Sequence, residues 1–248
     1  MKKRILSLLV MGAFIILQSN TNSIKHIEQT QTLPVNGTWI HREGNQEQVL
    51  LFVDGYYTQT TYNKIDKQFI DTRGGVFSIS ANSMQIDIEF DTKDKEQIGQ
   101  TVNCDFSIQQ NELTIQQQGK KTVYKKISDA IEPLTGVWAI TGRMQEGKVV
   151  AIQRTGTRKT LKILCGTRFQ WAAIDPGQKS FSGTGGGSYE FVNGKYTEHI
   201  EFFSRDSSRV GASLQFDGKI ENGEWHHSGL SSKGDKIYEV WGRVMNSK

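Results

Sequence analysis

The sequence predicts an all-β fold in which two antiparallel β-barrels follow one another along the chain. Short runs rich in Val, Ile, Phe, Tyr and Thr alternate between apolar and polar residues. Turn signals such as Asp54-Gly55, Asn193-Gly194 and Asn222-Gly223 separate these runs. The pattern also occurs twice, because adding 112 to a residue number maps Val49–Leu113 onto Leu161–Trp225 without a gap.

An internal duplication explains the matches between the two copies. Glu89-Phe90 aligns with Glu201-Phe202 at this offset. Upstream, Gly37-Thr38-Trp39 corresponds to Gly136-Val137-Trp138 at an offset of 99, so the second copy has 13 extra residues (112 minus 99) before Leu161. The repeat is the size of a domain, which excludes a solenoid of short repeats.

The N-terminus has the three regions of a secretory signal. Met1-Lys2-Lys3-Arg4 precedes the apolar run Ile5–Leu17, and small polar residues continue to Ser23. The run is too short to span a bilayer comfortably. We therefore expect residues 1–23 to be removed, leaving an exported chain in the periplasm or outside the cell with no membrane span. A retained anchor is the alternative.

The rest of the chain divides at Ser128–Pro133 into barrels expected at residues 33–127 and 134–248. No long stretch shows helical periodicity, so each copy is expected to be a meander that closes on itself. Loss of the signal lowers the formal charge from +4 to +1, which argues against a nucleic-acid partner. Cys104 aligns with Phe216 and Cys165 with Val53, so buried thiols are favoured over a disulfide.

A family resemblance adds to this pattern. Gly-x-Trp at Trp39 and Trp138 resembles the opening motif of lipocalins and their calycin relatives. There an Arg on the last strand often packs over the Trp; Arg243 is placed to do so, whereas the first copy offers only Lys125 or Lys126.

The second copy, over about Leu134–Val244, also resembles a domain-of-unknown-function family of secreted lipocalin-like barrels. The motifs are Gly186-Gly187-Ser188-Tyr189, Tyr196-Thr197-Glu198-His199-Ile200-Glu201, Val210-Gly211 and Glu239-Val240-Trp241-Gly242-Arg243-Val244. The resemblance implies two tandem lipocalin-like barrels and a role as an accessory protein of polysaccharide-degrading bacteria. It supplies no activity and no catalytic residues.

Comparison of the copies predicts which residues point inward, because strand side chains alternate between faces. Met84, Ile86, Ile88 and Phe90 form an apolar stripe, and their partners are Tyr196, Glu198, Ile200 and Phe202. Glu198 is therefore expected inside the second barrel, with His199 and Glu201 facing solvent. Trp225 and His227 are expected inside as the partners of Leu113 and Ile115.

An inward carboxylate needs a donor or a wet cavity. His227, Tyr196 and Tyr189 are candidate donors for Glu198. One interpretation is a satisfied core network without a ligand. The other is a small polar cavity, walled by Trp225 and Trp171, that orients a ligand.

The inserted segment Thr141–Thr160 is basic, with a local charge of +4. Its charged residues are Arg143, Lys148, Arg154, Arg158, Lys159 and Glu146. Loops at a barrel mouth often bind ligands, so Arg154 and Arg158 are candidate contacts for an acidic partner such as a uronate or sulfated sugar. A solvated hairpin is the alternative.

The leading hypothesis is an exported, non-enzymatic protein that binds a small molecule or oligosaccharide in its second barrel, serving polysaccharide breakdown or uptake. The first barrel is expected to be a packed structural or docking module. One alternative is a sugar isomerase, epimerase or lyase using Glu198 and His227 as catalytic groups; another is a protein-interaction module. No metal or cofactor is expected, because His226 and His227 point to opposite faces and no zinc spacing occurs.

Overall fold

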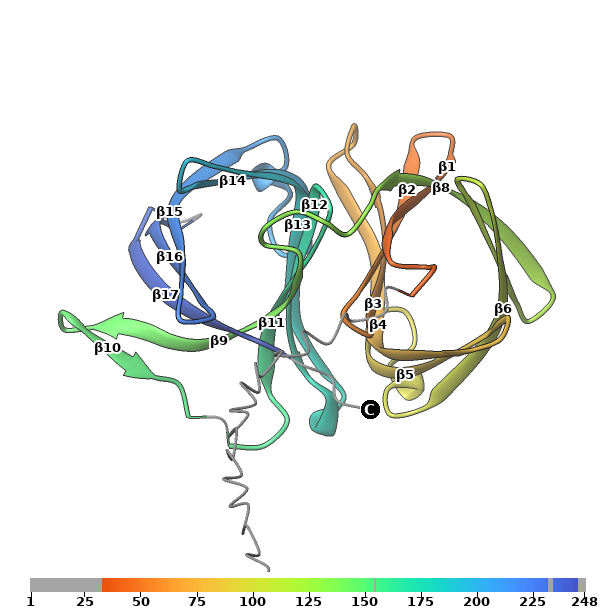
Figure 1. The fold of residues 1–248 in the computed structure, drawn as a ribbon, viewed down its shortest axis with the longest axis horizontal. Coiled ribbons are helices and arrows are strands. Elements are labelled where there is room, and N and C mark those ends of the chain that lie inside the picture. The colour runs from red at the N-terminus through yellow and green to blue at the C-terminus, as the bar shows by residue number, and fades with distance from the viewer. Residues whose placement is uncertain (1–32, 154, 232–233, 245–248) are drawn as a thin grey trace, which may run out of the picture. The chain divides into compact units, whose positions relative to one another are not determined.

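The computed structural model describes residues 33–153, 155–231 and 234–244. The expected signal at 1–23 lies outside them. Within the described residues, antiparallel strands make two barrels, joined by short turns and three single-turn 3-10 helices (Figure 1). No helix in this part of the chain is long and apolar enough to cross a membrane.

The first barrel closes because its last strand pairs with its first. Its strands are β1 (Gly37–Glu43), β2 (Gln46–Val53), β3 (Tyr56–Asn63), β4 (Gln68–Ser80), β5 (Ser83–Asp91), β6 (Thr101–Gln109), β7 (Glu112–Gln117) and β8 (Lys120–Ser128), with η1 (Lys95–Gln97) before β6.

The second barrel closes in the same way through β9 and β17. Its strands are β9 (Gly136–Gln145), β11 (Lys159–Cys165), β12 (Arg168–Asp175), β13 (Ser180–Val192), β14 (Lys195–Phe203), β15 (Ser213–Glu221), β16 (Glu224–Leu230) and β17 (Lys236–Arg243), with η2 (Pro176–Gln178) and η3 (Ser207–Arg209). The inserted segment lengthens β9 and adds β10 (Lys148–Ala151), which pairs with β9 as a hairpin (Figure 1).

Irregularities of the strands repeat between the copies, which confirms the tandem architecture. The β4–β5 ladder shifts register at Gly74/Gly75, and the β13–β14 ladder shifts at Gly186/Gly187. Both bulges require glycine. A Cβ on Gly75 would lie 1.9 Å from the Asp87 carbonyl oxygen, and one on Gly187 would lie 2.0 Å from that of His199.

Each opening Trp is covered by a cation from the last strand. The Arg243 guanidinium lies 4.5 Å from the ring centre of Trp138, and the Lys126 ammonium lies 5.2 Å from that of Trp39. Lys126 therefore takes the place of the arginine in the first barrel. The two free cysteines are buried, as expected.

Apolar side chains form three cores: one inside each barrel, and one between the barrels that includes Val49, Phe90, Leu161 and Phe202. The expectation that Phe90 and Phe202 point inward is wrong. Gly74 pairs with Phe90 while Gly75 pairs with Ile88, so the ladder skips Glu89. This bulge breaks the alternation and turns Phe90 towards the other barrel, and the equivalent bulge does the same for Phe202.

The interface between the barrels repeats its own contacts, as a two-fold relationship between the copies requires. Phe90 stacks on Phe181 with ring centres 6.4 Å apart, and the equivalent pair, Phe202 and Phe69, has the same separation. Lys159 donates to Glu89 at 2.6 Å across the interface. The expected position of Lys159 at a barrel mouth is therefore wrong, because its charge is used between the barrels.

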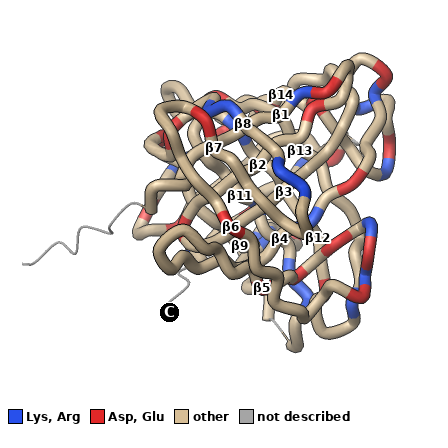
Figure 2. The backbone as a smooth tube through the Cα atoms, turned by 90° about the vertical axis from the view of Figure 1, so that its right-hand side faces the viewer, with Lys and Arg blue, Asp and Glu red and all other residues tan. Residues whose placement is uncertain are grey.

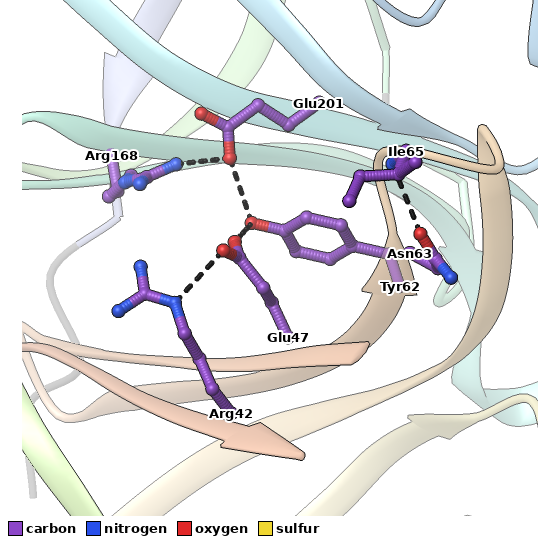
Figure 3. A network of polar contacts seen from close by, with 7 residues as sticks. All are labelled: Arg42, Glu47, Tyr62, Asn63, Ile65, Arg168 and Glu201. Carbon is purple, nitrogen blue, oxygen red and sulfur yellow. Dashed lines mark hydrogen bonds and ion pairs between the residues drawn. The ribbon is translucent and has the colours of Figure 1, made fainter. Parts of the chain in front are cut away.

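Glu201 also lies in this interface, although it was expected to face solvent. Its carboxylate accepts hydrogen bonds from Arg168 at 2.5 Å and from the Tyr62 hydroxyl at 2.8 Å (Figure 3). The same hydroxyl lies 3.1 Å from Glu47, which is paired with Arg42 at 3.0 Å. Two carboxylates from different barrels thus share one tyrosine, with an arginine neutralising each.

Candidate functional site

The centre of the second barrel holds a buried ion pair. The Lys162 ammonium on β11 donates to the Glu198 carboxylate on β14 at 2.6 Å, and both side chains are 6% exposed. Glu198 therefore lies inside the barrel, as the alternation predicted, but its hydrogen-bond donor is Lys162 and not His227 or a tyrosine. Burying two charges is costly unless they are well paired, and this geometry supplies that pairing.

Aromatic rings surround the Lys162 ammonium. It lies 5.0 Å from the ring centre of Tyr196, 5.2 Å from Trp225 and 5.3 Å from Trp241. Aromatic faces at these distances stabilise a cation. Burial and the nearby Glu198 carboxylate raise the pKa of the Tyr196 hydroxyl well above its usual value. Tyr196 and Trp225 therefore stabilise the charged form of Lys162.

A histidine and a second carboxylate lie beside this pair. His227 Nδ1 on β16 is 3.7 Å from the Glu239 carboxylate on β17. Burial and the charge of Lys162 lower the pKa of His227, which keeps the imidazole neutral near pH 7. Burial would raise the pKa of Glu239, but His227 and Lys162 outweigh it and the pKa is lowered. Neither nitrogen of His227 meets a hydrogen-bond partner among the described residues.

These groups open onto a cavity of about 230 Å³. Its charged and titratable lining consists of Lys162, Glu198, His227 and Glu239. Its aromatic lining consists of Trp171, Phe203, Phe216 and Trp241. The cavity thus combines apolar walls with a few polar groups, which is the composition usual for small-molecule sites.

A wider basin of about 810 Å³ shares Trp171, Phe203 and Glu239 with this cavity and forms its mouth. Trp171 and Phe203 meet edge to face there, with ring centres 5.5 Å apart. Three arginines line the basin: Arg143, Arg205 and Arg209. Arg143 lies 3.7 Å from Glu239, and Arg209 lies 3.1 Å from Asp206.

Other residues predicted for the site lie elsewhere. Tyr189 is buried in the core of the second barrel and does not line the cavity. Arg158 is exposed and lines neither the cavity nor its mouth, and Arg154 lies outside the described residues. Acidic and basic positions are interspersed over the chain (Figure 2). Among the described basic residues of the inserted segment, Arg143 is the one that lines the mouth.

Sequence reasoning missed Lys162, Glu239 and the arginines Arg205 and Arg209. A signal for Lys162 existed, because it replaces Leu50 of the first copy. An apolar residue replaced by an ionisable one is the same change that identified Glu198. Arg205 and Arg209 show no such contrast with the first copy. Glu239 lies on the last strand, beyond the gapless alignment of the two copies.

Comparisons with known proteins add no family. No protein-family model matches the chain, and no curated protein matches its sequence. Among solved structures, the chain is similar to a DnaN sliding clamp (DNA polymerase III subunit beta) from Pseudomonas aeruginosa bound to griselimycin. The identity is 10%, the match covers 88% of this chain and 79% of the clamp, and the TM-score is 0.13. That score is too low to relate the two folds.

Proposed function

We propose that this chain is an exported, non-enzymatic binding protein of the lipocalin-like type. Its second barrel holds a small, polyhydroxylated and acidic ligand, such as a uronate sugar. The setting we propose is the degradation or uptake of polysaccharides in the periplasm or outside the cell, as implied by the resemblance of the second copy to secreted barrels and by the signal-like N-terminus.

The observation that carries this proposal is the unmet hydrogen-bonding capacity of His227 in a cavity. A buried polar group without a partner costs free energy, and both nitrogens of this ring lack one among the described residues. Two hydroxyls of a ligand in the cavity could satisfy the ring, one donating to one nitrogen and another accepting from the other. Trp171 offers an apolar face for a sugar ring at the mouth.

The acidic class follows from the arginines of the mouth. Arg205 is exposed, its Nε donates to the Ser182 carbonyl oxygen at 2.6 Å, and it forms no ion pair with the described residues. A carboxylate that extends from the cavity would meet this guanidinium.

Calorimetric titration of the full chain with trigalacturonate, and with maltotriose as the neutral comparison, tests the proposal. We expect trigalacturonate to bind, with an affinity that falls as salt is added because exposed charges are screened. Equal binding of maltotriose would contradict the acidic class, and absence of binding to both would contradict the carbohydrate class.

A second candidate is a sugar isomerase, epimerase or lyase in which His227 removes a proton. The observation in its favour is the neutral imidazole beside Glu239, since a free base next to an orienting carboxylate suits general-base catalysis. Glu198 would then hold Lys162 in place. Incubation with trigalacturonate in D₂O tests this role. An enzyme of this kind would place deuterium in the sugar or form an unsaturated product, and the absence of both would reject the role.

Protein interaction through exposed aromatic residues has less support. The large apolar side chains exposed in the described part of the chain are aliphatic, among them Ile131, Val149 and Leu230. The open polar cavity favours a ligand over this role.

A further inference from the structure

The first barrel encloses a cavity of its own, of about 480 Å³. The first barrel, expected to be a packed structural or docking module, is therefore not packed throughout. Buried residues at its inner end are Tyr57, Ile86, Cys104 and Tyr124, and exposed residues at its outer end are Lys93, Asp94, Gln118 and Lys120. A cavity of this size suits a small-molecule ligand.

A guanidinium lines this cavity and forms no ion pair with the described residues. Arg73 on β4 donates from Nη2 to the side-chain oxygens of Gln117 at 3.0 Å and Gln59 at 3.4 Å. Its Nε is buried and meets no hydrogen-bond partner among the described residues, which also provide no ion pair for Arg73. Tyr57 and the charge of Asp91 help to raise the pKa of Arg73, but a half-buried cation that donates to neutral amides and has no ion pair lacks the direct partner that such groups usually have.

Asp91, the cross-strand partner of Arg73, uses one carboxylate oxygen to accept from the backbone. Asp91 accepts from the N–H groups of Lys93 at 2.8 Å and Asp94 at 2.9 Å. The turn that leads to η1 thus fixes the position of the Asp91 carboxylate. It does not supply a bond to Arg73.

These polar groups are absent from the second barrel. At the offset of 112, Arg73 corresponds to Gly185, Gln59 to Trp171 and Gln117 to Gly229. A Cβ on Gly185 would lie 2.7 Å from the Trp171 indole nitrogen, so the tryptophan fills the space that Arg73 uses in the first barrel. The charged interior residues of each barrel thus align with apolar or small residues of the other.

We propose that the first barrel is a second ligand site, which takes a small hydroxylated carboxylate such as a monomeric sugar acid. The carboxylate binds the Arg73 guanidinium, whose planar fork favours bidentate contact with a carboxylate. Ligand hydroxyls exchange hydrogen bonds with the amides of Gln59 and Gln117 and with the Tyr57 hydroxyl, which already donates to Gln59 at 2.7 Å. This site is independent of the one proposed in the second barrel.

Nuclear magnetic resonance of the full chain tests the site directly, because the Arg73 Nε–H group has its own signal. The probe is D-glucuronate, with D-glucose as the neutral match and inorganic sulfate as the bare anion. At about 10 mM, a probe with a Kd of 1 mM occupies roughly nine sites in ten. We expect glucuronate to shift the Arg73 Nε–H signal, and glucose to leave it unchanged.

The Trp171 indole N–H signal separates the two sites. A shift at Trp171 alone would overturn the first-barrel site while leaving the second-barrel proposal intact. An equal response of Arg73 to glucose would overturn the carboxylate anchor. An equal affinity for sulfate would overturn the sugar-acid class.

Variants supply an independent readout. Arg73→Gln should weaken glucuronate binding about 10- to 100-fold, and Arg73→Lys should weaken it less because one charge remains without the fork. Lys195→Gln removes one positive charge from an exposed pair with Asp217 in the second barrel, and should leave binding unchanged. Unaltered binding by folded Arg73→Gln would overturn the site. If that variant fails to fold, the response of the Arg73 Nε–H signal in the unaltered chain decides whether the site exists.

Discussion

The Lys162 ammonium and the Glu198 carboxylate meet 2.6 Å apart inside the second barrel, at positions that Leu50 and Ile86 occupy in the first. Either charge alone would be buried without a partner. The two copies therefore provide a natural comparison between an apolar and an ionic interior on one backbone.

Replacing the pair by the residues of the first barrel should separate stability from binding. Lys162→Leu alone leaves Glu198 buried and unpaired, which should lower the free energy of unfolding by about 3–5 kcal/mol. Adding Glu198→Ile should restore most or all of this loss, because well-packed apolar residues commonly equal a buried ion pair. Urea unfolding of both variants measures the difference. A double variant as unstable as the single one would contradict the account.

Acid should destabilise the chain through His227. Its pKa is lowered in the folded state by burial and by Lys162, while Glu198 on β14 and Glu239 on β17 oppose that shift. As pH falls below the ordinary value of about 6.5, the unfolded chain takes up the proton first, so stability falls until the folded-state pKa is passed.

His227→Ile, the residue found at the equivalent Ile115, should remove this contribution. We expect the loss of unfolding free energy between pH 7.5 and about 5.5 to be smaller in the variant than in the unaltered chain. Glu239, whose pKa is also lowered, loses its contribution only below its ordinary value of about 4.5. Identical pH dependence in both chains would show that His227 is not buried in the neutral form.

The contact between barrels should depend on the Tyr62 hydroxyl. Tyr62→Phe removes the donor shared by Glu47 and Glu201 (Figure 3), and we expect a loss of about 1.5–3 kcal/mol in unfolding free energy, as for hydrogen bonds to charged groups. Tyr238→Phe removes a hydroxyl that meets His226 within the second barrel and should cost less. Equal losses would argue against a special role for Tyr62.

Much of the fold could be predicted from the sequence because strand alternation and turn residues are local signals. The offset between copies also placed Glu198 and His227 inside, since an apolar partner identifies the inward face. Phe90 could not be placed, because a bulge at Gly74/Gly75 depends on how two strands pair. Glu201 was misplaced for another reason: its outward face is covered by the first barrel, through Tyr62, and the pattern of one strand does not reveal this contact.

The site was predicted in part. Glu198 was found, but its partner Lys162 was overlooked although the Leu50 contrast carried the same information. Glu198 was identified by the contrast between an apolar residue of the first copy and a polar one of the second. Applied in reverse, it indicates Arg73, which aligns with Gly185.

Calorimetric titration of trigalacturonate into the full-length double variant Lys162→Leu, Glu198→Ile tests whether the ligand binds in the cavity beside this ion pair. We expect a folded chain that has lost trigalacturonate binding, whereas an Ile86→Val chain retains it. Retained binding by the folded double variant would contradict the claim that this cavity is the ligand site of the second barrel.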